Sequence, residues 1–206
     1  MTADASVLSF PAERAKAFID AVVAIAMTLL ILPLMESVTE LPDSVSGAHW
    51  LDEHSEDLIG FVVSFAVIAT FWITHHRFFA RIERVTTPFL WLTMPWLLTI
   101  VWLPVATSLS NHLAAGDVVV KLLYIGSMSL TAWLMLAQRI YMKRRPSLHD
   151  VSPDEMRSGT AATIAMGLLF AVALVLAILF PAIGYAALFV MAITGVVERL
   201  IRRILP

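Results

Sequence analysis

Residues 14–33 read RAKAFIDAVVAIAMTLLILP. This stretch places the carboxylate of Asp20 at the start of a nearly unbroken apolar run. A soluble helix would alternate polar and apolar faces along such a length, and a lipid-facing helix would exclude a carboxylate. The composition of the whole chain decides between these two environments.

The composition favours a membrane protein. The 206 residues are 59% hydrophobic and 15% charged, and their mean hydropathy is +0.83. Ordinary globular chains are about a quarter charged, so this chain has too little polar surface to cover a soluble domain. Cysteine is absent, which excludes disulfides and thiolate metal sites. Arg14 and Lys16 could begin a signal peptide, but no convincing cleavage site follows, and we expect the first helix to be retained.

Six apolar segments come close to the length of about 20 residues that a bilayer-spanning helix needs. They are Phe18–Met35, Asp57–Phe79, Pro88–Leu109, Val118–Tyr141, Gly159–Phe180 and Ile183–Val197. The last is the shortest, and we expect it to tilt or to extend toward Ile201. The sequence therefore predicts an all-α, polytopic membrane protein with six transmembrane helices. Residues 1–206 would form one domain, with a short N-terminal segment at about 1–15 and an acidic outer loop at about 36–56.

Basic residues mark one side of this membrane domain. They fall in the N-terminal segment, in the second-to-third loop, in the fourth-to-fifth loop and in the C-terminal segment. Lys121 is the only one of the 14 Lys and Arg residues near the other side, where the loops are acidic. Cytoplasmic loops carry an excess of Lys and Arg. Together with an even number of spans, this asymmetry predicts that both termini are cytoplasmic.

A uniform aliphatic stripe runs along the first helix. On a helical wheel of about 100° per residue, Phe18, Ala21, Leu29 and Leu32 fall within about 40° of Ile25, and Thr28 within about 60°. The stripe has two interpretations. It could face lipid or a neighbouring helix, or several subunits could arrange it as rings that line a pore and gate it by dewetting.

Asp20 lies about 140° from that stripe on the wheel. A carboxylate at membrane depth needs a partner, and the sequence FWITHHR at 71–77 offers candidates at a similar depth. Trp72, His75 and His76 are spaced to share one face of the second helix, and Arg14 could join them. These groups could form a structural hydrogen-bond network or a proton relay.

Several other chemistries lack their residue patterns. His75 and His76 diverge by about 100° on a helix, so one ion cannot easily take both, and no His-x-x-x-His pattern occurs. The chain has no P-loop, no nucleophile elbow and no Thr-Val-Gly-Tyr-Gly potassium filter. We therefore expect no enzyme activity, no metal, no cofactor and no nucleic-acid partner.

These residues together resemble a known family. RAKAFID at 14–20 is similar to the Arg-x-x-x-Phe-Ser-Asp signature of the transmembrane protein 175 potassium channels, with Ile19 in place of the serine. Trp72 and His75 match the family's Trp-x-x-His on the second helix. LPVATSL at 103–109 resembles the end of the family's third helix. Earlier in the same segment, Thr93 stands in place of a usual asparagine. The resemblance covers the first three helices, and the last three mainly by hydropathy.

The resemblance implies a six-helix subunit of a homotetramer without a re-entrant filter. The first helix would line the pore, with Ile25, Thr28 and Leu32 at the narrow rings, and Leu29 belongs to the same stripe. The resemblance also implies an interhelical polar network that fixes the helices. Its members would be Arg14, Phe18, Asp20, Trp72, His75 and Thr93.

The sequence thus predicts a cation channel of the plasma (inner) membrane that passes potassium more readily than sodium. Its selectivity should be modest, because dehydration at hydrophobic rings would replace a carbonyl filter. Its partners would be potassium and other monovalent cations, the lipid bilayer and identical subunits. The first alternative is a proton-coupled secondary transporter that uses Asp20 and His75, and the second is a membrane-embedded redox or haem protein.

Overall fold

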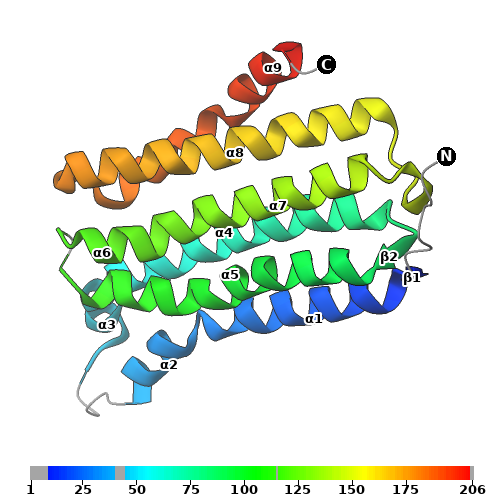
Figure 1. The fold of residues 1–206 in the computed structure, drawn as a ribbon. Coiled ribbons are helices and arrows are strands. Elements are labelled where there is room, and N and C mark those ends of the chain that lie inside the picture. The colour runs from blue at the N-terminus through cyan, green and yellow to red at the C-terminus, as the bar shows by residue number, and fades with distance from the viewer. Residues whose placement is uncertain (1–8, 40–44, 115, 205–206) are drawn as a thin grey trace.

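The computed structural model describes residues 9–39, 45–114 and 116–204. Long helices lie side by side in a bundle (Figure 1). Five helical stretches are long and apolar enough to cross a membrane: Glu13–Thr39, Ser55–Ala80, Thr87–His112, Val118–Lys143 and Pro153–Leu179. Each has 26 or 27 residues, which at about 1.5 Å per residue exceeds the hydrocarbon thickness of about 30 Å.

The first of these stretches is broken. Helix α1 (Glu13–Leu29) ends before Leu30 and Ile31, and α2 (Leu32–Thr39) begins after them. Pro33 explains the break, because proline has no N–H to donate to the carbonyl of Leu29 and its ring crowds that carbonyl. Figure 1 shows α2 turned away from the line of α1.

The acidic outer loop contains a short helix, α3 (Gly47–Glu53). Ser46 caps it by accepting a hydrogen bond from the backbone N–H of His49. The indole Nε1 of Trp50 donates to Oγ of Ser37 at 3.2 Å and ties α3 to α2. Helix α4 (Ser55–Ala80) follows directly. Residues 40–44 of the expected loop lie outside the described residues.

A small sheet joins the start of the bundle to its middle. Strand β1 (Ser9–Pro11) pairs antiparallel with β2 (Arg84–Thr86), which leads into α5 (Thr87–His112). The chain just before α1 is therefore held against the connection between α4 and α5. Residues 1–8 of the expected N-terminal segment lie outside the described part of the chain.

The fourth stretch changes its helical type on the way. It consists of α6 (Val118–Lys121), a π-helical turn η1 (Leu122–Gly126) and α7 (Ser127–Lys143). A 3₁₀ turn, η2 (Pro146–Leu148), precedes α8 (Pro153–Leu179). Ser152 and Glu155 form a capping box at the start of α8, and Arg81 at the end of α4 pairs with Glu155 at 3.2 Å. The ends of α4 and α8 are thereby linked.

The predicted sixth span differs from the other five. Residues Pro181–Ile193 form a 3₁₀ stretch, η3, and α9 covers Thr194–Ile204. Neither is among the helices of the described residues that are long and apolar enough to span a bilayer. The structure thus supports five candidate spans, and the sixth stays a prediction. A 3₁₀ helix rises about 2.0 Å per residue, so the 13 residues of η3 cover about 26 Å as they run back along α8.

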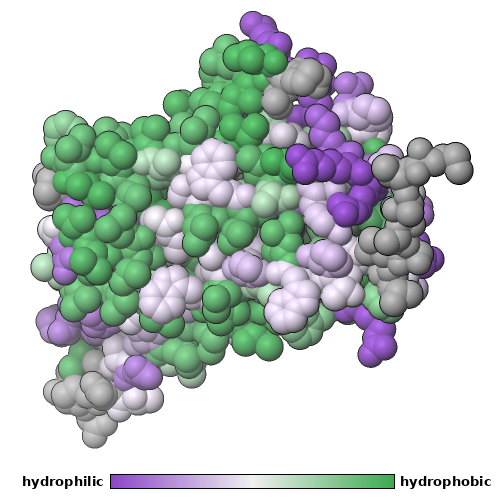
Figure 2. Space-filling model, in the orientation of Figure 1, coloured by the Kyte–Doolittle hydropathy of each residue, from purple (hydrophilic) through white to green (hydrophobic). Residues whose placement is uncertain are grey.

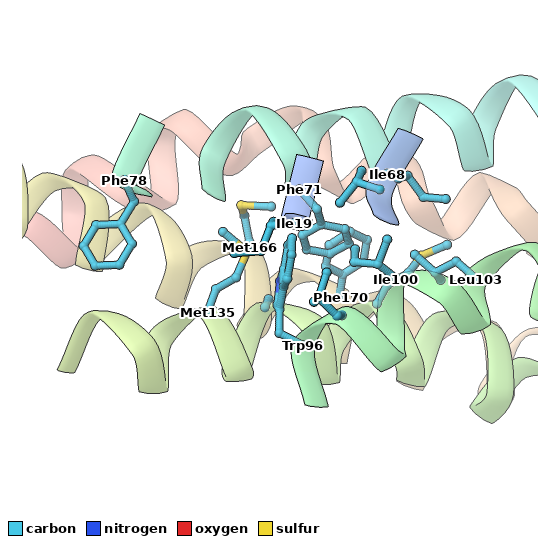
Figure 3. Packing of buried hydrophobic residues seen from close by; sticks show 14 of the residues in the cluster. Ile19, Ile68, Phe71, Phe78, Trp96, Ile100, Leu103, Met135, Met166 and Phe170 are labelled. Atoms are coloured by element: carbon cyan, nitrogen blue, oxygen red, sulfur yellow. The ribbon is translucent and has the colours of Figure 1, made fainter. Parts of the chain in front are cut away.

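The helices follow one another from one edge of the bundle to the other. α1 packs on α4 and α5, α7 lies between α5 and α8, and η3 and α9 pack on α8. Buried aromatic and aliphatic side chains from several of these helices meet in the centre (Figure 3), among them Ile68, Phe71, Trp96, Ile100 and Phe170. Lipid is as apolar as these side chains, so close packing rather than exclusion of water holds such helices together.

The outer surface of the bundle is apolar. Hydrophobic side chains cover most of the face seen in Figure 2, and hydrophilic ones gather toward its right-hand end, where α1 and α8 begin. Large apolar residues are exposed on every long helix, and Trp91 and Leu98 of α5 are examples. A surface of this kind fits lipid.

The close approach of α7 and α8 depends on a glycine. A Cβ atom added at Gly167 would lie 2.9 Å from Cε2 of the Trp133 ring. We expect Gly167→Ala to lower the free energy of unfolding by about 1–3 kcal/mol, because the ring has to shift to admit the methyl group. Denaturant titration of the detergent-solubilised protein measures the change.

Gly195 on α9 is the matched control, because a Cβ there would meet nothing within 4 Å. Gly195→Ala should leave the protein as stable or stabilise it by up to about 1 kcal/mol, since alanine favours the helix. Equal destabilisation by both substitutions would contradict the packing argument.

Candidate functional site

Helix α1 presents two different faces. Ile19, Val23 and Ala26 are at most 3% exposed and pack into the bundle. The aliphatic stripe of the sequence lies on the other face, away from the rest of the chain. Its members keep large exposed fractions: Ile25 59%, Phe18 54%, Leu32 45% and Leu29 38%. The stripe is therefore free to contact lipid or another molecule.

Thr28 adds a polar group to this exposed face. Its hydroxyl donates to the carbonyl of Ile25 at 2.7 Å, which satisfies the donor within the helix. The hydroxyl oxygen keeps its lone pairs as acceptors. Helix α1 ends one residue later at Leu29, so Leu32 follows on α2, beyond the break.

Asp20 reaches across to α4. The indole Nε1 of Trp72 donates to its carboxylate oxygen at 2.9 Å, and Nδ1 of His76 lies 3.5 Å from the same oxygen. The Trp72 and His76 rings also contact each other, with 5.3 Å between centroids. A hydrogen bond to a carboxylate is stronger than one between neutral groups. The carboxylate that stands out in the apolar first helix therefore has two partners on the neighbouring helix.

His75 lies in a separate cluster. It is 1% exposed, and its Nε2 is 3.0 Å from Oε1 of Gln138 on α7. Its ring stacks between Trp96, at 3.8 Å between centroids, and Phe79, at 4.3 Å. The neighbouring histidines diverge because successive residues on a helix point about 100° apart. The sequence suggested His75 as a partner of Asp20, but the structure gives that position to His76.

The other expected network residues point elsewhere. Arg14 is exposed, and within the described residues no hydrogen bond or ion pair joins it to another side chain. Phe18 belongs to the exposed stripe of α1. Thr93 is buried and donates to the carbonyl of Phe89 in its own helix at 2.9 Å. Of the six residues, the structure thus joins Asp20 to Trp72 directly.

A second buried polar cluster was not predicted from the sequence. The hydroxyl groups of Ser64 and Tyr124 lie 2.7 Å apart, and Thr107 donates to Ser64 at 2.8 Å. These three residues come from α4, η1 and α5. Nearby in the chain, Nζ of the buried Lys121 donates to the carbonyl of Ala177 in the last turn of α8, at 2.7 Å. The only signal in the sequence was that Lys121 is the single basic residue near its side of the membrane.

No metal centre is evident in the part of the chain that the structure describes. No group of three or more His, Asp or Glu residues within it comes close enough to hold a metal ion. Each of the three polar clusters contains a hydrogen bond between side chains of different helices: Trp72 to Asp20, His75 with Gln138, and Ser64 with Tyr124. Their arrangement joins neighbouring helices of the bundle.

The bond between Asp20 and Trp72 can be tested with a double-mutant cycle. We expect Asp20→Ala and Trp72→Phe each to lower the free energy of unfolding, and their combination to cost less than the sum. The double variant should be less destabilised than the sum of the single variants by about 0.5–3 kcal/mol, because each single substitution removes the same hydrogen bond. Denaturant titration in detergent micelles measures each variant.

Trp91 provides the control for this cycle, since it is 71% exposed on α5. Trp91→Phe combined with Asp20→Ala should be additive within about 0.5 kcal/mol. Additive effects for Trp72 as well would show that the hydrogen bond adds nothing to stability.

The site lies within the region that matches a known family. Residues 14–104 match the family model described as endosomal/lysosomal potassium channel TMEM175. This range includes the exposed stripe, Asp20, Trp72, His75, His76 and Thr93. It covers α1 to most of α5 and leaves out α6 to α9.

Individual relatives show the same partial similarity. A protein named potassium channel from Streptomyces collinus is 33% identical over 115 residues, which cover 50% of this chain and 53% of the relative. Another of that name, from Chamaesiphon minutus, is 31% identical over 96 residues, 47% of each chain. The endosomal/lysosomal proton channel TMEM175 of Bos taurus is 34% identical over 82 residues, 37% of this chain and 17% of its own.

The chain thus spans about half the length of the bacterial relatives it matches. The names of the family and of these relatives denote ion channels, and none denotes an enzyme. Residues 14–104 of this all-α protein, with its several apolar helices long enough to cross a membrane, are thus similar to the TMEM175 family of potassium channels.

Proposed function

We propose that this protein is a potassium-permeable cation channel, with residues 1–206 as one channel domain. The observation that carries the proposal is the exposed aliphatic face of α1, which lies in the region matched by a potassium-channel family. In a homotetramer this face would surround the central axis. Ile25, Thr28, Leu29 and Leu32 would each contribute four side chains to the pore lining.

Selectivity in such a pore would come from dehydration. Rings of Ile25 and Leu29 offer no ligand to an ion. The ion therefore has to lose part of its water shell when it passes these rings. Potassium holds its water less tightly than sodium, which favours its passage. Thr28 would supply the polar ring between them, with hydroxyl oxygens as weak acceptors for a cation. This proposal requires no cofactor, and potassium is the ion that the channel conducts.

The alternative is a proton-coupled transporter that uses Asp20 and His75. The TMEM175 protein of Bos taurus bears the name of a proton channel, so proton movement has to be measured. However, Asp20 contacts Trp72 and His76, whereas His75 contacts Gln138. A relay from Asp20 to His75 would have to bridge two separate clusters, and this favours the channel.

Current recording distinguishes these functions. Purified protein in planar bilayers, with potassium on one side and sodium on the other, should give single-channel currents with a reversal potential that favours potassium. A transporter would give saturable flux without single-channel steps. Flux that requires a pH gradient would replace the channel by the proton-coupled alternative.

The proposed constriction predicts the effect of a polar substitution. Ile25→Asn should raise single-channel conductance and reduce the preference for potassium, because amide groups wet the ring and replace lost water ligands. Ile25→Phe should reduce conductance by narrowing the same ring. Both are measured under the bi-ionic conditions described above.

Ile59 on α4 is the matched control, because its exposed fraction of 57% nearly equals that of Ile25. Ile59→Asn should leave conductance and selectivity unchanged. If Ile25→Asn tetramers assembled normally and conducted as the unmodified protein does, the exposed face of α1 would not form the narrow part of the pore.

We also propose a location in the plasma (inner) membrane with both termini in the cytoplasm. The connections with Arg81, Arg84 and Lys143–Arg145 support this orientation, since basic connections stay on the cytoplasmic side. Reporter domains that work only in the cytoplasm should both be active when they are fused before Met1 and after Pro206. A periplasmic signal from the second fusion alone would indicate an odd number of spans.

A further inference from the structure

Helix α9 combines two features that the proposed pore does not use. Ile193 just before it, and Val196, Leu200 and Ile204 within it, are spaced three or four residues apart and form one apolar stripe. Their side chains are 49%, 57%, 53% and 83% exposed. Arg199, Arg202 and Arg203 lie on the same short helix. This pattern is typical of helices that lie in the interface of a bilayer.

Four arginines gather beside this stripe. Arg157 of α8 joins Arg199, Arg202 and Arg203 around a shallow depression of about 360 Å³. Nε of Arg157 donates to the backbone carbonyl of Arg202 at 3.2 Å, which fixes α8 against α9 at this point. Among the residues that the structure describes, only these four arginines line the depression.

The cluster has no internal counter-charge in the described residues. No described carboxylate lies within ion-pairing distance of any of these four guanidinium groups. Glu198, the acidic residue of α9, instead accepts a hydrogen bond from the Ser158 hydroxyl at 3.1 Å. Four like charges around one hollow repel one another, and an anion bound between them would relieve that repulsion.

The chemistry of arginine indicates the kind of anion. Guanidinium groups present paired donors whose geometry matches phosphate oxygens, and several can share one phosphate. Such an anion could be free in solution or could be part of a lipid. The apolar stripe beside the arginines favours a lipid, because a free phosphate would leave that stripe in water.

The position in the bundle favours the same ligand. Arg157 lies in the second turn of α8, just before the long apolar part of that helix, at the level where a membrane surface would meet the span. α1 and α9 pack at opposite edges of the bundle. In this respect the inference rests on the proposed function: with α1 at the centre of a tetramer, α9 would face the surrounding lipid.

We propose that Arg157, Arg199, Arg202 and Arg203 bind the phosphate of an anionic phospholipid at the membrane surface. The apolar stripe of α9 lies against the acyl chains of the same leaflet. The site would hold α8, η3 and α9 together through the lipid, in the part of the chain that lies beyond residue 104.

Thermal unfolding of the full chain in neutral detergent tests this site. Added dioleoyl phosphatidylglycerol should raise the unfolding temperature in a saturable manner, and dioleoyl phosphatidylcholine should not. Arg199→Gln/Arg202→Gln should weaken the apparent affinity for phosphatidylglycerol about 30-fold, given the usual contribution of each basic residue near an anionic surface. Arg203→Gln, which changes one exposed residue, should weaken it about fivefold and is the fallback if the double variant does not fold.

Lys143→Gln/Arg144→Gln is the matched control, because it removes two exposed charges at the end of α7. It should bind phosphatidylglycerol as the unmodified protein does. An equal loss in this control would reduce the effect to overall charge and overturn the site. The site is also overturned if inorganic phosphate stabilises as well as the lipid does, if both lipids act alike, or if the arginine variants change only the oligomeric state, which would indicate a contact between copies. No ion current is measured, so the result stands apart from the channel proposal.

Discussion

Polar groups within the hydrocarbon of a bilayer must find their partners in the protein, because water is not there to supply them. In this chain several of these partners come from a different helix. Trp72 of α4 donates to Asp20 of α1, Tyr124 and Thr107 meet Ser64, and Lys121 donates to the end of α8. Since apolar surfaces give little preference for one helix over another in lipid, these bonds act together with close packing in determining which helices become neighbours. The carboxylate in the first helix therefore belongs to the structural framework of the bundle.

The two faces of α1 have different roles: one packs within the subunit, and the other is proposed to line the pore. The inward face, with Val23 and Ala26, is almost fully covered by α4 and α5. The outward face has no partner within the described chain and carries the residues proposed for the pore. Because Asp20 engages Trp72 on α4, its charge is held beside that helix and is not presented with the stripe. A substitution on one face can thus alter assembly while a substitution on the other alters ion passage.

The amount that the sequence could predict varies with the kind of signal. Long apolar runs located helices closely, as the predicted segment Asp57–Phe79 shows beside the observed Ser55–Ala80. The run after Pro181 was short and rich in small residues, and the 3₁₀ geometry of η3 could not be read from hydropathy. The partner of His75 was equally hidden, because apolar residues surround a buried membrane helix on all sides and leave its rotation undefined. Gln138 lies 63 residues away and is brought close only by the packing of α7.

The break after Leu29 has an electrical consequence. In the proposed tetramer, the rings that α1 itself contributes, from Ile25 to Leu29, would span about 6 Å at the helical rise. If the pore of the tetramer is wider and filled with water beyond these rings, most of the membrane voltage would drop across this short distance. A monovalent ion crossing it would gain or lose about 2.3 kcal/mol for each 100 mV. The proline that ends the straight part of the first span would in this way concentrate the driving force on a single turn of helix.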